Sequence, residues 1–307
     1  GSGRRSCCRR DQSRVISILM SEPVDLNVGG FTRLRIDFGY DGTDFFGWSK
    51  QPELRTIQAA FLEALTLIFG ESEIDFSLRV AGRTDAGVHA LHQVAHFDLT
   101  ETQLARLGRE TIDDIAYKLN RLLPSDIRVA AVGAAPAGFD ARFSAVNRRY
   151  RYRLADNLSF KNPLETRFTL DVAGQLDLDA MNEAGGHLLG LHDFASFCKP
   201  REGSTTIREL QEIVVSRGVG QVVEIEVQAD AFCHNMVRSI VGALIAVGQG
   251  RATPAKIKQL LEQTNREGSY KVVSPHGLSL LGIGYPADDQ LAEQSQKAQN
   301  LRTLDEN

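Results

Sequence analysis

Residues 81–90, "AGRTDAGVHA", hold a single acidic side chain, Asp85, between glycines at positions 82 and 87. The flanking segments, 76–83 and 88–99, each have the pattern of a β-strand, which places Asp85 in the turn between them. Glycine permits backbone angles or a close ligand approach that other residues resist. Rigid flanks would position this carboxylate and leave it reachable. The short stretch alone favours another interpretation, an acid that only caps its own turn.

The chain before and after this turn alternates strands and helices. A strand is expected over 30–39, a glycine-rich aromatic loop over 40–48, a helix over 55–70 and another over 111–124, then a strand over 127–135. Thr56 is a suitable N-cap for the first helix, and Gly70 a suitable terminator. The first half of the chain is therefore predicted to mix helices with strands.

A similar order returns in the second half. It comprises a strand over 148–155, a helix over 177–190, a hairpin over 205–217 and 221–229, helices over 233–250 and 254–263, and a strand over 277–285. We therefore predict an α+β protein of two related halves with mixed or antiparallel sheets. The predicted division is an extension over 1–29, a half over 30–147 that carries Asp85, a half over 148–286, and a polar tail over 287–307.

Composition sets limits on the partners of this chain. The 307 residues are 42% hydrophobic and 24% charged, and no run approaches the ~18 apolar residues of a membrane-spanning helix. Net charge is −4, and the body between the basic first 19 residues and the acidic last 21 is itself acidic. A polyanion would therefore need a local basic surface. Four cysteines, two adjacent at 7 and 8 and two isolated, form no disulfide framework and favour the cytoplasm.

One basic cluster stands out. The stretch from Arg142 to Arg153 holds five arginines and no acid, and it includes "RRYRYRL" at 148–154. Strand alternation sends the arginines at 149, 151 and 153 to one face and Tyr150 to the other. This pattern fits a solvated strand face over a core that contains tyrosines. It also fits a surface that holds phosphates, with a tyrosine free to stack on a base.

Two further features involve ionisable side chains. The histidines at 89, 92 and 96 have a spacing that suggests metal binding, but on a strand His89 would face away from the other two. Arg238 is the one charge within the apolar stretch of helix 233–250. A buried guanidinium needs an anion, and Asp85 is the obvious candidate, although an arginine at a helix start can also extend to solvent.

"AGRTDAGVHA" resembles the catalytic loop of the TruA family of tRNA pseudouridine synthases. Six more segments resemble that family in the same order, and together they cover about residues 31 to 286. They are "YDGTDFFGW" (40–48), "RTIQAAFLEAL" (55–65), "NRLLPSDIRV" (120–129), "FDARFSAVNRRYRYRL" (139–154), "FCHNMVRSIVGAL" (232–244) and "GLSLLGIGY" (277–285).

The resemblance implies the pseudouridine-synthase fold, two sheet halves around a basic cleft, and isomerisation of uridine at about positions 38 to 40 of the tRNA anticodon stem-loop. It implies a homodimer that uses no cofactor and no metal. The family's catalytic aspartate falls on Asp85, its active-site tyrosine on Tyr150, its aspartate-pairing arginine on Arg238, and the arginine before the aspartate on Arg83.

On this basis, Arg142, Arg148 and Arg149 are candidate RNA contacts. A tRNA-binding or folding module with the same basic surface is the alternative of a different class, and a metal-dependent hydrolase built on the three histidines is a third. A pure RNA binder would gain little from a carboxylate beside phosphates, which favours the enzyme.

Overall fold

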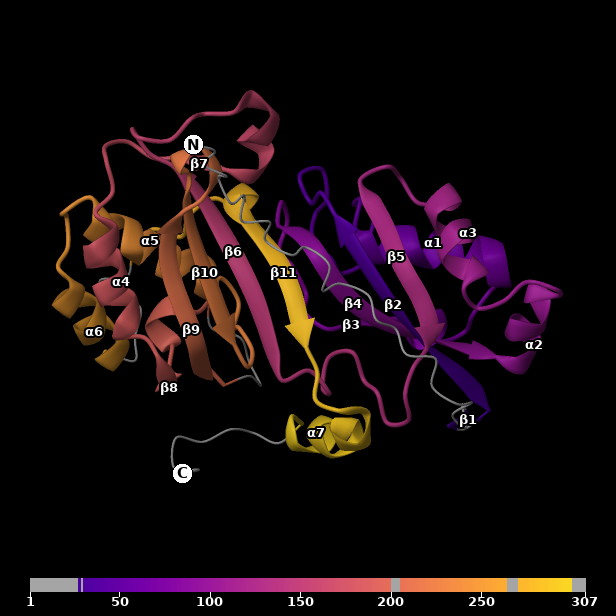
Figure 1. Ribbon diagram of the computed structural model, residues 1–307. Coiled ribbons are helices and arrows are strands. Elements are labelled where there is room, and N and C mark those ends of the chain that lie inside the picture. The colour runs from indigo at the N-terminus through magenta and orange to yellow at the C-terminus, as the bar shows by residue number, and fades with distance from the viewer. Residues whose placement is uncertain (1–26, 29, 200–204, 264–269, 300–307) are drawn as a thin grey trace, which may run out of the picture.

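The computed structural model describes residues 27–28, 30–199, 205–263 and 270–299, and its centre is a mixed sheet of eleven strands (Figure 1). The order along the sheet is β1-β2-β4-β11-β6-β10-β9-β8, with β3 beside β4, β5 beside β2 and β7 beside β6. The strands are β1 (Asn27–Val28), β2 (Phe31–Tyr40), β3 (Arg79–Val80), β4 (His89–Thr100), β5 (Ile127–Ala134), β6 (Asn147–Ala155), β7 (Leu170–Asp171), β8 (Gly190–Asp193), β9 (Ile207–Arg217), β10 (Val223–Ala229) and β11 (Leu278–Gly284).

The last strand joins the two halves. β11 runs parallel to β4, with Ser279 opposite His89, and antiparallel to β6, with Leu280 opposite Tyr150. The strands that flank the Asp85 loop and the strand that carries Tyr150 are therefore parts of one continuous sheet. The predicted α+β class is confirmed.

Helices gather in two groups, α1–α3 beside the first half and α4–α6 beside the second (Figure 1). The helices are α1 (Ile57–Phe69), α2 (Glu101–Leu104), α3 (Asp114–Leu122), α4 (Leu178–Gly186), α5 (Met236–Gly248), α6 (Pro254–Glu262) and α7 (Leu291–Lys297). Thr56 caps α1 by accepting a hydrogen bond from the Ala59 N–H, and Gly70 ends it at φ 79°, as the sequence predicts. Within the described residues, no helix is long and apolar enough to cross a bilayer.

Where the structure describes them, the predicted N-terminal extension and C-terminal polar tail contain regular elements. Asn27 and Val28 form β1 against β2, while residues 1–26 of the predicted extension lie outside the described residues. Residues 287–299 belong to the predicted polar tail, yet they contain α7, which lies below the end of β11 in Figure 1. Leu291 of α7 is 1% exposed and packs with Ala81 and Phe139, which explains why this part of the tail is ordered.

A buried carboxylate braces the second half. Asp156 is fully buried, and its oxygens accept hydrogen bonds from both terminal nitrogens of Arg217, at 3.1 and 2.7 Å. They also accept from the N–H groups of Leu158 and Leu176 and from the Ser159 hydroxyl. Burial alone would raise the pKa of Asp156, but these donors hold it well below its ordinary value.

We expect Asp156→Asn to lower the free energy of unfolding by about 3 kcal/mol, because Arg217 would lose its buried counter-charge. The folded-state pKa is depressed, so this stabilisation is complete above the unfolded-state pKa of about 3.9 and shrinks as the pH falls below it. Urea unfolding of both proteins from pH 7 to pH 3 measures the effect. A difference between them that stays constant across this range would contradict it.

Candidate active site

The backbone of the Asp85 loop is fixed from both sides. The Gln93 side chain donates to the Gly82 carbonyl at 2.8 Å, and the Tyr40 and Thr84 hydroxyls are 2.7 Å apart. The glycine-rich aromatic loop supplies the other contacts, from the Trp48 N–H to the Thr84 carbonyl and from the Gly87 N–H to the Phe45 carbonyl. The loop that presents Asp85 is therefore held by the segment 40–48 rather than by its own turn alone.

Gly47 shows how closely these two loops approach. Its φ is +88°, and a Cβ atom at this position would lie 2.8 Å from the Thr84 carbonyl oxygen. Since that oxygen belongs to the residue before Asp85, a larger side chain at position 47 would displace the carboxylate.

Two cationic or protonatable side chains from the second half face Asp85. Arg238 Nη1 lies 3.6 Å from one carboxylate oxygen, and His234 Nε2 lies 3.5 Å from the other. The Asp85 side chain is 37% exposed, so its oxygens remain reachable from solvent. Both side chains therefore face a carboxylate whose oxygens could act as a nucleophile.

Arg238 is itself held in place. It lies in the first turn of α5, its side chain is 17% exposed, and its Nε donates to the Val273 carbonyl at 2.8 Å. A second donor, Nη1, lies 3.3 Å from the Asn235 side-chain oxygen. The structure thus brings together Asp85 and Arg238, which are 153 positions apart in the chain, and favours the ion pair over an arginine that extends to solvent.

Tyr150 lies beside the same loop. Its hydroxyl would be 3.7 Å from a Cβ atom at Gly82, and its ring meets Phe232 edge-on with centroids 5.2 Å apart. Burial raises the pKa of the Tyr150 phenol well above its ordinary value, and the nearby Asp85 charge adds to the effect while Arg148 opposes it. The raised pKa keeps the Tyr150 phenol neutral. The side chain is 7% exposed, and its ring offers a mostly apolar face beside the carboxylate.

The arginines predicted to contact RNA have different surroundings. Arg83 is exposed and makes no hydrogen bond or ion pair with any described residue. Arg142 is also exposed, and its guanidinium lies over the Phe143 ring at 5.1 Å from the centroid. Both are positioned to meet a ligand from solvent.

Arg148 points into the protein instead. It is 8% exposed, and its terminal nitrogens donate to four backbone carbonyls rather than to a carboxylate. The acceptors are Ala145 (3.2 Å), Asp230 (2.6 Å), Ala81 (3.0 Å) and Arg142 (2.6 Å). Ala81 begins the Asp85 loop and Asp230 belongs to the second half, so Arg148 connects the two.

Arg149 lies on the opposite face of β6 and pairs with Glu226 of β10 and Glu212 of β9. Its Nη2 is 2.5 Å from a Glu226 oxygen, and Arg151 pairs with both Glu224 and Glu226. The outward face of β6 is therefore a charge-compensated strand face, the first of the two interpretations of this arginine-rich strand. Glu224 and Glu226 alternate with apolar residues in "QVVEIEVQA" (221–229). This alternation is the sequence signal that could have predicted an acidic strand face opposite the arginines.

The three histidines of β4 do not converge. His89 accepts from the Gly42 N–H and contacts the His276 carbonyl, His92 contacts Asp37, and His96 accepts from the Ala141 N–H. Burial lowers the pKa of His96 to about 4, which keeps it neutral. No group of three or more potential metal ligands occurs within the described residues.

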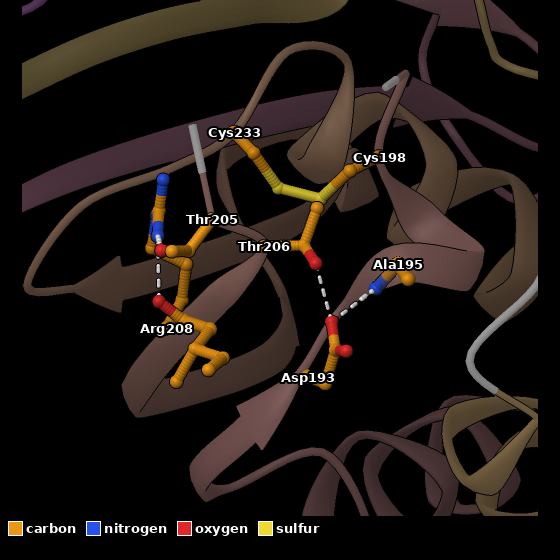
Figure 2. The surroundings of a disulfide bond; sticks show 8 residues. Asp193, Ala195, Cys198, Thr205, Thr206, Arg208 and Cys233 are labelled. Atoms are coloured by element: carbon orange, nitrogen blue, oxygen red, sulfur yellow. Dashed lines mark hydrogen bonds between the residues drawn. A yellow bond between two sulfur atoms is a disulfide. The ribbon is translucent and has the colours of Figure 1, made fainter. Parts of the chain in front are cut away.

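The cysteines at 198 and 233, expected to stand alone, form a disulfide (Figure 2). Their Cα atoms are 5.7 Å apart, and the link joins the segment after Phe197 to the loop that precedes α5. The Lys199 N–H also donates to the His234 carbonyl at 2.9 Å. Figure 2 shows Asp193 beside this link, where it accepts from Ala195 and Thr206. A separation of 35 residues gave no spacing signal for this pair.

We expect reduction of this disulfide to lower the free energy of unfolding by about 3–4 kcal/mol, because the unfolded chain would regain the freedom of a 35-residue loop. Denaturant unfolding with and without dithiothreitol measures the change, and thiol titration counts the two groups released. Cys198→Ser/Cys233→Ser is the control, and it should show no response to the reductant at these positions. Equal stability of the parent with and without reductant would contradict the expectation.

Sequence reasoning also missed His234. It lies within "FCHNMVR" (232–238), but the sequence carries no information on its distance from Asp85. Nothing in the sequence indicated the disulfide or the Lys199 contact, which hold the His234 backbone.

Comparison with known proteins is consistent with this geometry. A family model described as tRNA pseudouridine synthase matches residues 38–144 and 184–286. The tRNA pseudouridine synthase A of Leifsonia xyli is 47% identical over 89% of this chain and 98% of its own length. The enzyme of the same name from Streptomyces avermitilis is 49% identical over 90% and 95%, and that from Mycobacterium leprae is 44% identical over 90% and 98%.

Solved structures are more distant. An archaeal box H/ACA sRNP Nop10–Cbf5 complex aligns with a TM-score of 0.33 at 10% identity, over 85% of this chain and 53% of that chain. The alignment spans about half the length of that solved chain. The family model covers both the Asp85 loop and the segment of Arg238, and the curated relatives match nearly from end to end. On that ground, the chain belongs to the tRNA pseudouridine synthase family.

Proposed function

We propose that this protein isomerises uridine to pseudouridine at about positions 38 to 40 of the tRNA anticodon stem-loop, with Asp85 as the nucleophile. The observation that carries the proposal is the solvent-reachable Asp85 carboxylate, which Arg238 and His234 of the other half face and which Tyr150 adjoins. The family match and the names of the curated relatives support tRNA as the substrate.

The reaction needs a carboxylate of this kind. The N1–C1′ bond of the nucleotide breaks, the uracil turns, and C5 bonds to C1′. Nothing is oxidised and no group is lost. Asp85 can hold the fragments by bonding either to the ribose or to the base. Arg238 stabilises the negative charge of Asp85 before the attack, and its own contacts with Val273 and Asn235 keep it in place.

A uridine inside a stem must leave the stack before Asp85 can reach it. The Tyr150 ring is the apolar surface on which an extruded uracil can stack. The exposed guanidinium of Arg83 is suited to fill the vacated stack or to hold a phosphate, and Arg142 is suited to a backbone phosphate. Arg148 and Arg149 have protein partners, which leaves the exposed Arg83 as the stronger of these RNA contacts.

The resemblance also supports a homodimer. Light scattering of the purified protein checks the dimer, with the monomer mass as the contrary outcome.

The test of the function is tritium release from [5-³H]uridine-labelled tRNA, followed by mapping of pseudouridine in the product. We expect release that excess EDTA does not inhibit, with modification at positions 38 to 40. Binding without release would favour the tRNA-binding module, and modification outside the anticodon stem-loop would contradict the proposed target.

We expect Arg238→Met to reduce tritium release by about 100-fold, because Asp85 would lose its nearest fixed positive charge. Methionine keeps the unbranched apolar stem of the arginine side chain, so the fold of α5 should be retained. Single-turnover kinetics measure the effect. Arg251→Met, at an exposed position beyond the end of α5, is the control and should match the parent. An unchanged rate for Arg238→Met would remove Arg238 from the mechanism.

A further inference from the structure

The segment of residues 273–276, which leads into β11, holds Arg238 by two backbone contacts. The Val273 carbonyl accepts from Arg238 Nε at 2.8 Å, and the Val273 N–H donates to the Arg238 carbonyl at 3.4 Å. The Nη1 atom of the same guanidinium lies 3.6 Å from an Asp85 oxygen. The place of the segment 273–276 therefore sets where the Arg238 guanidinium lies relative to Asp85.

The same segment also contacts the first half of the protein. Pro275 Cγ lies 2.9 Å from the position that a Cβ atom on Gly87 would take, and Gly87 follows Asp85 by two residues. The His276 carbonyl lies 3.0 Å from Nε2 of His89, which begins β4 directly after the Asp85 loop. Consecutive residues of one short segment therefore contact both sides of the ion pair that crosses the two halves.

Tyr152 of β6 holds the middle of this segment. Its hydroxyl donates to the Ser274 carbonyl at 2.6 Å, and Ser274 is the residue between Val273 and Pro275. The Tyr152 side chain is fully buried, and a Cβ atom on Gly277 would lie 2.5 Å from its ring atom Cε1. The ring therefore packs against the chain just after the segment, while the hydroxyl fixes the segment itself.

The Tyr152 phenol keeps the proton that this contact needs. Burial raises the pKa of Tyr152 well above its ordinary value, although the nearby Arg238 charge opposes the shift. Without the hydroxyl, the Ser274 carbonyl would lose this donor, and the segment would be free to shift against β6. A displacement of about 1 Å in a group that acts on the reaction can lower its rate by as much as about 100-fold.

We propose that Tyr152 is a positioning residue of the candidate active site: its hydroxyl fixes the segment 273–276, and this segment holds Arg238 beside Asp85. The inference rests on the proposed function, in which Arg238 stabilises the charge of Asp85. Because the Tyr152 side chain is fully buried, it acts through Arg238 and not on the nucleotide. This separates its role from that of Tyr150, two residues earlier on the same strand.

The first test is Tyr152→Phe, which removes the hydroxyl and keeps the ring. We expect single-turnover tritium release to fall about 10-fold with tRNA affinity unchanged. Tyr117→Phe is the matched control, because Tyr117 is 65% exposed on α3 and its hydroxyl accepts from Arg121 at 3.3 Å. It should behave as the parent. Parent-like release by Tyr152→Phe, or an equal loss of tRNA affinity, would overturn the assignment.

A double-mutant cycle shows whether Tyr152 acts through Arg238. We expect Tyr152→Phe/Arg238→Met to release tritium within about twofold of the rate of Arg238→Met alone, because a residue that positions the guanidinium has nothing to position once it is gone. A residue that only stabilises the fold would slow both backgrounds equally. A further tenfold loss in the Arg238→Met background would therefore contradict the proposal.

The third readout needs no turnover. The Arg238 Nε–H, which donates to Val273, gives an arginine side-chain signal in ¹⁵N NMR spectra that is identified by its absence from Arg238→Met. We expect its exchange with water to be about tenfold faster in Tyr152→Phe than in the parent and in Tyr117→Phe. Equal exchange in all three proteins would show that the hydroxyl does not hold Arg238.

All variants are compared at a temperature at which thermal melting shows each of them to be folded. Absence of tritium release by the parent would refute the proposed function itself. The exchange rate of the Arg238 Nε–H would still report whether Tyr152 anchors the segment 273–276, so the two failures are distinguishable.

Discussion

We expect Asp85→Asn to reduce tritium release from [5-³H]uridine-labelled tRNA by more than about 10⁴-fold, because an amide cannot act as the nucleophile. Asparagine has nearly the same shape, and its single side-chain oxygen can still face either Arg238 or His234, which lie beside different oxygens of Asp85. The contacts that fix the loop come from Gly82, Thr84 and Gly87 rather than from the Asp85 carboxylate. The affinity for tRNA should therefore remain close to that of the parent.

The measurement pairs single-turnover tritium release with filter binding of the same tRNA. Asp171→Asn is the matched control, because its side chain is 66% exposed on the short strand β7 and, among the described residues, pairs only with Lys161. It should retain parent activity. Turnover by Asp85→Asn within tenfold of the parent would show that another group attacks the nucleotide. A parallel loss of tRNA binding would show that Asp85 acts chiefly in recognition.

Most of the regular elements could be predicted because their side chains repeat over many residues. β2, α1 and β5 lie within one or two residues of their predicted bounds. Where the structure differs, a local backbone feature is the cause. The strand predicted over 76–83 is reduced to Arg79–Val80, because Asp75–Ser77 form a tight turn with positive φ. The helix predicted from 233 begins at Met236, because Asn235 is left-handed.

The candidate site could be predicted only where the physical chemistry of one residue requires another. A guanidinium on an apolar helix needs an anion, and that requirement led from Arg238 to Asp85. No comparable requirement pointed to His234, whose proximity to Asp85 depends on how β11 joins the halves. The Cys198–Cys233 link depends on the same packing. Arg148 and Arg149 were grouped by charge, although strand alternation sends them to opposite faces.

Because Arg148 and Arg149 lie on opposite faces of β6, their substitutions should have different effects on stability. We expect Arg148→Gln to lower the free energy of unfolding by about 3–5 kcal/mol, since four backbone carbonyls, two of them in buried hydrogen bonds, would lose their shared donor. Turnover should fall as well, because the Ala81 carbonyl anchors the start of the Asp85 loop. The salt dependence of tRNA binding should stay unchanged, because a guanidinium that contacts no phosphate releases no counterion on binding.

Arg149→Gln is the matched comparison, one residue away on the same strand. Its guanidinium is 43% exposed and pairs with Glu226 at the surface, so its loss should cost no more than about 1 kcal/mol. Urea unfolding and tRNA affinity from 50 to 300 mM salt measure both variants. If Arg148 bound a phosphate, Arg148→Gln would flatten the salt dependence and leave stability nearly intact. The opposite pattern, a large loss of stability with an unaltered salt slope, would establish Arg148 as the connection between the loop and the second half.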